Sequence, residues 1–187
     1  MTTSKKKAII MDRDGTLNKD PGYVHKVEDF ELLFGVIEGL NLLKDDYLFF
    51  IVSNQSGIGR GYYEEKDFWD FTNHLLSTLE ENQIHIERVY FCPHHPDIDC
   101  NCRKPKTKFM DDILSEYKID LDGSWMIGDH PSDVQFGVNA GIKSVFLLTG
   151  HGKKHLHELE EKEIEPTIMA KNFLDAAKSI KNYSHIS

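Results

Sequence analysis

The stretch IIMDRDGTLN at residues 9–18 places a short apolar run directly before two aspartates, Asp12 and Asp14. The apolar run is typical of a buried strand, which we expect over residues 8–11. A buried strand usually ends in an uncharged turn, whereas here two carboxylates are followed at once by Gly15. Taken alone, they are compatible with an acidic turn in which Gly15 supplies a positive φ, and equally with an active site. The rest of the chain must decide between the two.

The remaining chain alternates apolar runs with segments of helical spacing. Apolar or β-branched runs recur at residues 8–11, 48–52, 89–91, 125–127 and 145–148, with a shorter one at 167–169. Apolar residues at helical spacing occur between them, at 36–43, 68–79, 113–117 and 134–140. Strands that alternate with helices predict a Rossmann-like, doubly wound parallel sheet with helices on both faces. We therefore expect one α/β domain over residues 1–187, with a flexible tail at 183–187.

A charged stretch near the end of the chain, residues 157–165, predicts the solvated face of a helix. The histidines at 151, 155 and 157 have a spacing that does not suggest a metal site. We expect these histidines to lie on the surface.

The overall charge argues against several classes of partner. Among 187 residues, 31 are acidic and 22 basic, which gives a net charge of −9. This balance disfavours nucleic acid and anionic membranes as partners. No apolar run approaches the ~20 residues of a membrane helix, and Asp12 interrupts the N-terminal apolar run too early for a secretory signal. We expect a cytoplasmic monomer that acts on a small molecule.

Polar residues follow the predicted strands one after another. The first predicted strand is followed by Asp12 and Asp14, and the second by SNQSGIGRG at 53–61. The third is followed by CPHHPDIDCNCRKPK at 92–106, and the fourth by GDHPSD at 128–133. Ligands of such sheets bind beyond the carboxyl ends of the strands. The fold therefore brings carboxylates, a hydroxyl and two cations to one edge.

This ordered set resembles the motifs of the haloacid-dehalogenase-like (HAD) phosphohydrolases. The motifs are DxDGT at 12–16, Ser53, Lys104 and GDxxxD at 128–133, and together with the predicted strands and helices they cover residues 8–141. Each motif alone has an ordinary structural explanation. The resemblance therefore rests on the occurrence of all four motifs together and in this order. The gaps between them are too short for a large cap domain, which implies a HAD fold without one.

The resemblance implies a phosphomonoester hydrolase that works through an aspartyl-phosphate. Asp12 would attack phosphorus, and Asp14 would protonate the leaving oxygen and later activate water. Ser53 and Lys104 would bind the oxygens of the transferring phosphoryl group.

A catalytic Mg²⁺ is implied as well, because a divalent cation must offset the negative charge of a phosphate ester. Its ligands would be the Asp12 and Asp129 carboxylates and the backbone carbonyl of Asp14. Asp133 would orient the Mg²⁺ shell or pair with Lys104.

The segment 92–102 offers three cysteines and a histidine in two close pairs. Cys92, His94, Cys100 and Cys102 supply four nitrogen and sulfur ligands, which match a closed tetrahedral zinc site. His94 is preferred over His95 because it completes the C-x-H pair and matches the family pattern. Four protein ligands leave no open position, so that we expect a structural Zn²⁺ in a loop that fixes the two following cations, Arg103 and Lys104.

The zinc loop narrows the resemblance to two groups of phosphatases. One group removes the 7-phosphate of D-glycero-D-manno-heptose 1,7-bisphosphate, and the other hydrolyses histidinol phosphate. The segments DPGYVH at 20–25 and SNQSGIGRGYY at 53–63 resemble the heptose group, whereas the short spacing between His94 and Cys100 is that of the histidinol-phosphate group. The resemblance therefore implies removal of the 7-phosphate of D-glycero-D-manno-heptose 1,7-bisphosphate, with histidinol phosphate or another small sugar phosphate as the alternative substrate.

The resemblance to the heptose group also implies a set of substrate-binding residues. Arg103 would recognise the distal part of the substrate, and the sugar would lie against Asp20, Gly22, Tyr23, Asn54, Gln55 and Ser56. His130 stands where the heptose enzymes usually have a lysine, and we include it among the substrate-binding residues. A DNA 3′-phosphatase would share the catalytic motifs, but the net charge disfavours it.

Overall fold

The computed structural model describes residues 5–183, and these form a parallel sheet covered by helices. The six strands are β1 (Lys7–Met11), β2 (Tyr47–Asn54), β3 (Arg88–Cys92), β4 (Trp125–Gly128), β5 (Lys143–Leu147) and β6 (Ile168–Ala170). Their spatial order is β3-β2-β1-β4-β5-β6, and every neighbouring pair is parallel. The predicted doubly wound α/β sheet is confirmed.

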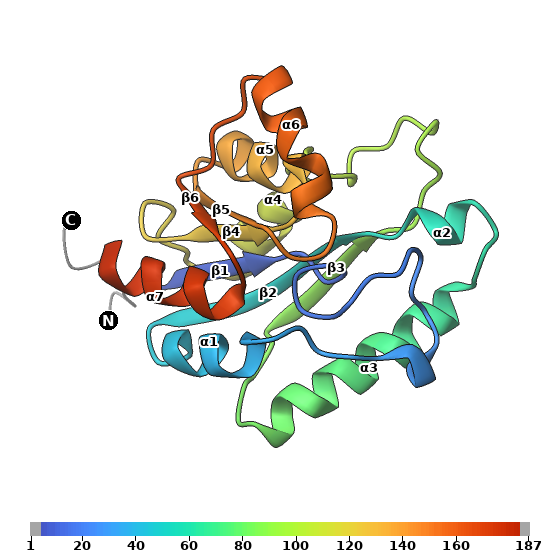
Figure 1. Cartoon of the computed structure of the whole chain (residues 1–187), viewed down its shortest axis with the longest axis horizontal. Coiled ribbons are helices and arrows are strands. Elements are labelled where there is room, and N and C mark those ends of the chain that lie inside the picture. Colours follow the sequence, from blue (N-terminus) through green and yellow to red (C-terminus); the bar gives the residue numbers. More distant parts are fainter. Residues whose placement is uncertain (1–4, 184–187) are drawn as a thin grey trace.

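Helices occupy the connections between the strands. They are α1 (Val36–Leu43), α2 (Ser56–Gly59), α3 (Glu65–Glu81), α4 (Lys108–Glu116), α5 (Pro131–Ala140), α6 (Gly152–Glu161) and α7 (Phe173–Tyr183), with a 3-10 turn over Val27–Asp29. Figure 1 shows α1, α3 and α7 on one side of the sheet, and α4, α5 and α6 on the other. None of the helices within residues 5–183 has both the length and the apolarity that a bilayer span requires.

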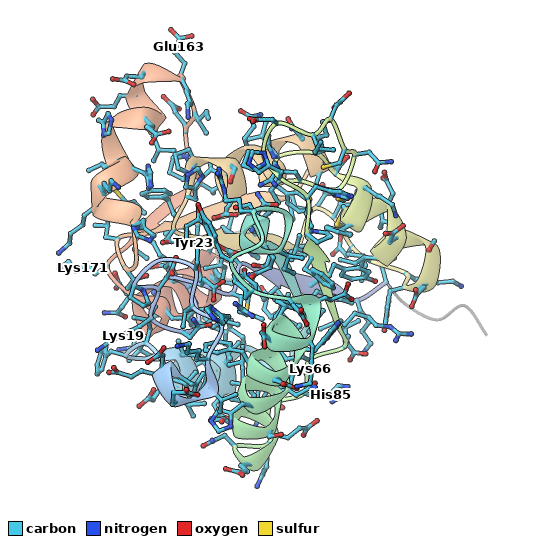
Figure 2. The ribbon with its side chains drawn as sticks, turned by 90° about the vertical axis from the view of Figure 1, so that its right-hand side faces the viewer. Lys19, Tyr23, Lys66, His85, Glu163 and Lys171 are labelled. Carbon is cyan, nitrogen blue, oxygen red and sulfur yellow. The ribbon has the colours of Figure 1, made fainter. Side chains whose placement is uncertain are left out.

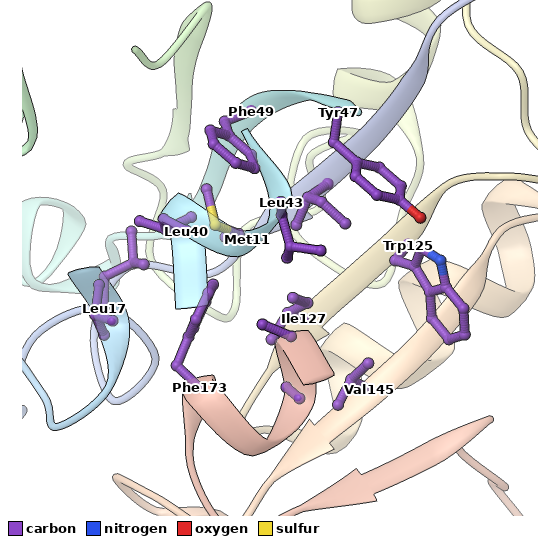
Figure 3. Packing of buried hydrophobic residues seen from close by; sticks show 14 of the residues in the cluster. Met11, Leu17, Leu40, Leu43, Tyr47, Phe49, Trp125, Ile127, Val145 and Phe173 are labelled. Carbon is purple, nitrogen blue, oxygen red and sulfur yellow. The ribbon is translucent and has the colours of Figure 1, made fainter. Parts of the chain in front are cut away.

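The central strands are largely apolar because both faces of the sheet are buried there. Ile9 and Met11 of β1 point into one core, and the alternate residues Ala8 and Ile10 point into the other. Figure 3 shows the first core, in which Phe173 of α7 packs with α1 and the central strands. The second core lies under α4 and α5. Charged side chains such as Lys66 and His85 lie on the outside (Figure 2).

Two elements near the C-terminus differ from the sequence analysis. Helix α7 was not predicted, although Phe173, Ala176, Ala177 and Ile180 have helical spacing and are buried. Helix α6 begins earlier than the charged stretch suggested, and its Leu159 packs on Val134 and Phe146. Of the predicted flexible tail, Tyr183 ends α7, and residues 184–187 lie outside the described residues.

Candidate active site

The carboxyl ends of the strands surround one polar pocket of about 510 Å³. Every residue predicted to act in catalysis or to bind the substrate lines it: Asp12, Asp14, Asp20, Gly22, Tyr23, Ser53, Asn54, Gln55, Ser56, Arg103, Lys104 and His130. Asp129, Asp133, Ser132, Tyr63, His151, Lys154 and His155 complete the wall. The sequence thus predicted which residues meet, while the chemical role of each stays a prediction at this point.

A buried ion-pair network lies at the base of the pocket. Lys104 Nζ lies 2.9 Å from Oδ1 of Asp12 and 2.7 Å from Oδ1 of Asp133. Burial by itself would lower the pKa of Lys104, but the charges of the two aspartates outweigh it and raise that pKa. Asn54 fixes the lysine backbone, since its Oδ1 accepts from Lys104 N–H at 3.0 Å and its Nδ2 donates to Lys104 O at 3.3 Å. Lys104 is therefore a fixed cation.

Three carboxylates converge around this lysine. Asp12, Asp129 and Asp133 each offer an oxygen within 4.8 Å of the others, and the Asp14 side chain is not part of this group. Burial raises the pKa of Asp12 to about 6 and also raises the pKa of Asp129. Buried carboxylates with so little opposing charge form a hard-oxygen donor set that suits Mg²⁺.

Gly15 allows this cluster to form. Its φ is +79°, as expected from the turn, and a Cβ at this position would lie 2.2 Å from Oδ2 of Asp129. The same Asp129 oxygen accepts a hydrogen bond from the backbone N–H of His151 at 2.7 Å. Only glycine gives the carboxylate the room to lie against the loop that follows β1.

Arg13, a residue that the sequence analysis did not single out, holds the Asp14 carboxylate. The arginine is fully buried, and its Nε and Nη2 donate to Oδ1 and Oδ2 of Asp14, each at 2.8 Å. Asn18 donates to Oδ1 at 3.0 Å and Gln55 donates to Oδ2 at 2.8 Å. A charged residue between two aspartates gives no sequence signal of burial, because the residues that bury it, Phe68, Phe71 and Thr72, lie elsewhere in the chain.

Gln55 links Asp14 to Ser53. Its Nε2 also donates to Ser53 Oγ at 2.8 Å, and its Oε1 accepts from the Tyr63 hydroxyl at 2.5 Å. Burial, reinforced by the charge of Asp14, raises the pKa of Tyr63, so that the phenol stays a donor. Both ends of the Gln55 amide are therefore bound within the protein.

The loop over residues 20–25 forms the outer wall of the pocket. Asp20 accepts from Gly22 N–H at 2.8 Å, and its other oxygen lies 3.2 Å from His151 Nε2. Tyr23 is 45% exposed and meets the ring of Tyr62 edge-on at 4.9 Å. Figure 2 marks Tyr23 on this side of the molecule.

We expected His151 and His155 to lie on the surface, and the His151 side chain is 40% exposed, but the sequence analysis did not predict that they belong to the pocket wall. Both line the pocket, where the ring of His155 lies 4.6 Å from that of His130. The signal was present, because both histidines follow the strand predicted at 145–148, and the rule that places residues at the carboxyl ends of parallel strands applies to them as well.

His130 caps helix α5 and stays neutral. Its Nδ1 accepts from Ser132 N–H at 3.2 Å, which requires an unprotonated nitrogen. Burial, with the nearby His155, lowers the pKa of His130 to about 4. Near neutral pH this position therefore presents an uncharged imidazole to the pocket.

A second cluster of possible metal ligands lies at the end of β3 and in the loop that follows it. The ligand atoms of Cys92, His94, Cys100 and Cys102 all lie within 4.8 Å of one another. Cys92 Sγ lies 3.6 Å from Cys100 Sγ and 3.0 Å from Cys102 Sγ, and His94 Nδ1 lies 3.2 Å from Cys102 Sγ. With Zn–S bonds of about 2.3 Å, such a group is compatible with tetrahedral zinc.

Comparisons with known proteins point to one family. The HAD-hydrolase-like family model matches residues 101–176. A D-glycero-beta-D-manno-heptose-1,7-bisphosphate 7-phosphatase of Haemophilus influenzae is 42% identical over 152 residues, which are 77% of this chain and 83% of the relative. A D-glycero-alpha-D-manno-heptose-1,7-bisphosphate 7-phosphatase of Campylobacter jejuni is 42% identical over 80% of this chain and 87% of the relative. The chain belongs to the HAD-like phosphatase family.

A solved structure supports the same assignment for this HAD-like phosphatase. The crystal structure of D,D-heptose 1,7-bisphosphate phosphatase from B. bronchiseptica, complexed with magnesium and phosphate, matches with a TM-score of 0.85 and 28% identity. The match covers 95% of this chain and 99% of that chain. The chain is thus a phosphomonoester hydrolase, of a family whose phosphatases use Mg²⁺.

Proposed function

We propose that this HAD-like phosphatase removes the 7-phosphate of D-glycero-D-manno-heptose 1,7-bisphosphate. The observation that carries the proposal is the identity of about two residues in five to phosphatases named for this substrate, over more than four fifths of their length. The pocket supports it, because all the residues predicted to bind phosphate and sugar line that pocket.

Asp12 is the nucleophile in this proposal. Its carboxylate lies in the pocket beside Lys104, which with Ser53 would bind the oxygens of the phosphoryl group. Attack by a carboxylate oxygen on phosphorus forms an acyl phosphate on Asp12 and breaks the bond to the sugar oxygen. The Lys104 ammonium would offset the charge that develops on the phosphoryl oxygens.

Asp14 carries the proton. It would donate a proton to the departing sugar oxygen and then take one from the water that hydrolyses the Asp12 phosphate. Both steps need the Asp14 carboxylate in a fixed place, which the four hydrogen bonds from Arg13, Asn18 and Gln55 provide.

Asp12 and Asp129 would hold the Mg²⁺ through their carboxylates, with the Asp14 carbonyl as a further ligand. When bound, the cation supplies charge neutralisation for the phosphate ester. Asp133 lies in the same carboxylate group and pairs with Lys104, one of the two roles expected for it.

A structural Zn²⁺ would be held by Cys92, His94, Cys100 and Cys102. The loop that carries these ligands leads directly to Arg103 and Lys104. A metal that fixes this loop would therefore fix two cations of the pocket.

The distal part of the substrate distinguishes heptose bisphosphate from histidinol phosphate. A second phosphate needs a cation, and Arg103 lines the pocket with a planar guanidinium. The cationic end of histidinol phosphate needs a carboxylate, and Asp20 was the candidate. Both oxygens of Asp20 already face partners, Gly22 N–H and His151. The contacts of Asp20 therefore favour the bisphosphate.

A phosphate-release panel with Mg²⁺ tests the proposal. It compares heptose 1,7-bisphosphate, histidinol phosphate, fructose 1,6-bisphosphate and 3′-phosphorylated DNA, with Asp12→Asn as the background. We expect kcat/KM for the heptose bisphosphate to exceed that for histidinol phosphate by at least ~100-fold, and Asp12→Asn to keep less than about a hundredth of the activity. Equal efficiency on both substrates would refute the substrate assignment, and an active Asp12→Asn would refute the nucleophile.

We also propose that the enzyme is a cytoplasmic monomer. Light scattering on the purified protein tests the monomer, and cell fractionation tests the compartment. A stable dimer, or recovery with the membrane fraction, would contradict the corresponding part.

A further inference from the structure

Arg13 is held rigidly although it lies beside a reactive site. Its side chain is fully buried, and its guanidinium carbon lies 4.9 Å from the ring centre of Phe68 and 4.7 Å from that of Phe71. Its Nη1 donates to Thr72 Oγ1 at 2.9 Å. All three partners belong to α3, which lies along the loop that follows β1 (Figure 1). The long helix thus fixes the direction of the guanidinium.

The remaining nitrogens of Arg13 bind Asp14 side-on. Nε and Nη2 each donate to a different oxygen of the carboxylate, the two-bond geometry that gives arginine its directional preference. With the donors from Asn18 and Gln55, each oxygen of Asp14 receives two hydrogen bonds. A carboxylate has about four acceptor positions, so that protein donors occupy all of them.

This saturation has a consequence for proton transfer. A proton on Asp14 must take the position of one of the four donors. The charge-assisted bonds from Arg13 are the stronger ones, so that an amide donor, from Asn18 or Gln55, gives way first. The carboxylate therefore keeps its orientation on Arg13 while its proton changes.

We propose that Arg13 is a positioning residue for proton transfer by Asp14. Because it is fully buried, it acts on the substrate only through its partners, of which Asp14 has the two shortest bonds; its Nη2 also donates to Val24 O at 3.2 Å and to Gln55 Oε1 at 3.4 Å. The inference rests on the proposed function in one respect, which is the acid–base role of Asp14. It predicts that loss of the guanidinium fork slows the hydrolysis of substrates with poor leaving groups and has little effect on substrates with good ones.

The test compares two leaving groups in the holoenzyme. An alkyl phosphate, the best sugar phosphate of the panel, needs a proton on its departing oxygen, whereas p-nitrophenyl phosphate leaves as a stable anion. The ratio kcat/KM reports only steps up to phosphoryl transfer to Asp12. For Arg13→Lys, which keeps the charge and loses the fork, we expect about a 10- to 100-fold loss on the alkyl phosphate and less than about 5-fold on the aryl phosphate.

A second variant covers the case in which Arg13→Lys does not fold. Thr72→Val removes the hydrogen bond to Nη1 but keeps the shape of the side chain. Thr72 is not one of the residues that line the pocket. It should reduce the alkyl reaction by about threefold to tenfold, again more than the aryl reaction. The matched control is Arg88→Met, on an exposed arginine that pairs with Glu116, and it should change neither reaction.

The leaving-group comparison also separates positioning from a general loss of structure. Arg13→Met, which lacks the fork as well, should again lose more activity on the alkyl phosphate than on the aryl phosphate. An equal loss on both substrates, in folded protein, would overturn the inference. Asp14→Asn gives the reference: if it fails to discriminate between the leaving groups, the proposed acid role fails instead. A wild type inactive on the heptose bisphosphate refutes only the substrate.

Discussion

Lys104 Nζ lies 2.9 Å from Oδ1 of Asp12, and the lysine side chain is only 2% exposed. The same ammonium contacts Asp133 at 2.7 Å, and Asn54 holds the lysine backbone from the end of β2. One cation thus connects the loop after β1 with the start of α5. Removal of a partner from a buried pair leaves an uncompensated charge, which costs more than the pair itself contributes.

Lys104→Met should therefore impair both folding and activity. We expect the free energy of unfolding of the metal-free protein to fall by about 3 kcal/mol, since Asp12 and Asp133 lose their shared cation. Activity should fall at least ~100-fold, because the phosphoryl oxygens lose a donor. Urea unfolding and phosphate release measure the two effects. Lys106→Met, on an exposed lysine paired with Asp99, is the control, and a similar loss there would contradict the assignment.

Mg²⁺ binding should be strongly pH-dependent. Burial raises the pKa of Asp12 to about 6, and that of Asp129 also lies above its usual value of 3.8. Below about pH 6 the folded metal-free protein therefore binds protons that the unfolded chain does not bind. This proton binding stabilises the fold at low pH, and the stabilisation is lost as pH rises through about 6. Mg²⁺ needs the ionised carboxylates, so that it should raise Tm near about pH 8 and lose this effect by about pH 5.

Asp129→Asn provides the variant for that measurement. The substitution removes a buried charge and keeps an oxygen for His151 N–H. Tm of the metal-free protein should rise near neutral pH, and the increase caused by Mg²⁺ should disappear. Asp97→Asn, on a side chain that is 88% exposed, should behave as wild type. A full Mg²⁺ effect in Asp129→Asn would exclude this residue as a ligand.

The cysteine loop should hold about one Zn²⁺ per chain. His94→Ala should lose the metal and lower Tm, because the free energy of metal binding also stabilises the fold. His95→Ala is the matched control, since His95 is adjacent to His94 in sequence but lies outside the ligand group. Metal analysis of protein purified without chelators gives the stoichiometry. Zinc retained in His94→Ala but lost in His95→Ala would reverse the choice of histidine.

Arg103→Ala should change substrate choice more than catalysis. Arg103 Nη2 donates to the carbonyl of His94, and its buried Nε has no hydrogen-bond partner. We expect most of the ~100-fold preference for the heptose bisphosphate over histidinol phosphate to disappear, while hydrolysis of p-nitrophenyl phosphate changes little. Parallel kcat/KM measurements check this. A uniform loss on all three substrates would instead assign Arg103 to phosphoryl transfer.

Local patterns were sufficient for the fold and for most of the pocket. The central strands are apolar runs because the sheet is buried on both faces, and such runs are visible in sequence. Asp12, Lys104 and Asp129 follow three of these strands and Ser53 lies at the end of β2, so that a parallel sheet places all four at one edge whatever the details of packing. Helix α7 was not predicted, although the helical spacing of its buried residues was visible in the sequence. The start of α6 was placed too far along the chain, because the charged residues around Leu159 drew attention away from this apolar position.

The sequence by itself determined which carboxylates, cations and thiols lie at the carboxyl edge of the sheet. It also determined that four metal ligands are close together in one segment. The tertiary structure decided the contacts between residues distant in the chain. Arg13 is buried only because α3 supplies Phe68, Phe71 and Thr72. His151 contacts Asp20 and Asp129 only because the loop after β5 packs against the loop after β1, where Thr149 Oγ1 donates to the Gly15 carbonyl. Side-chain partners of this kind depend on packing in three dimensions, which leaves no periodic pattern in the sequence.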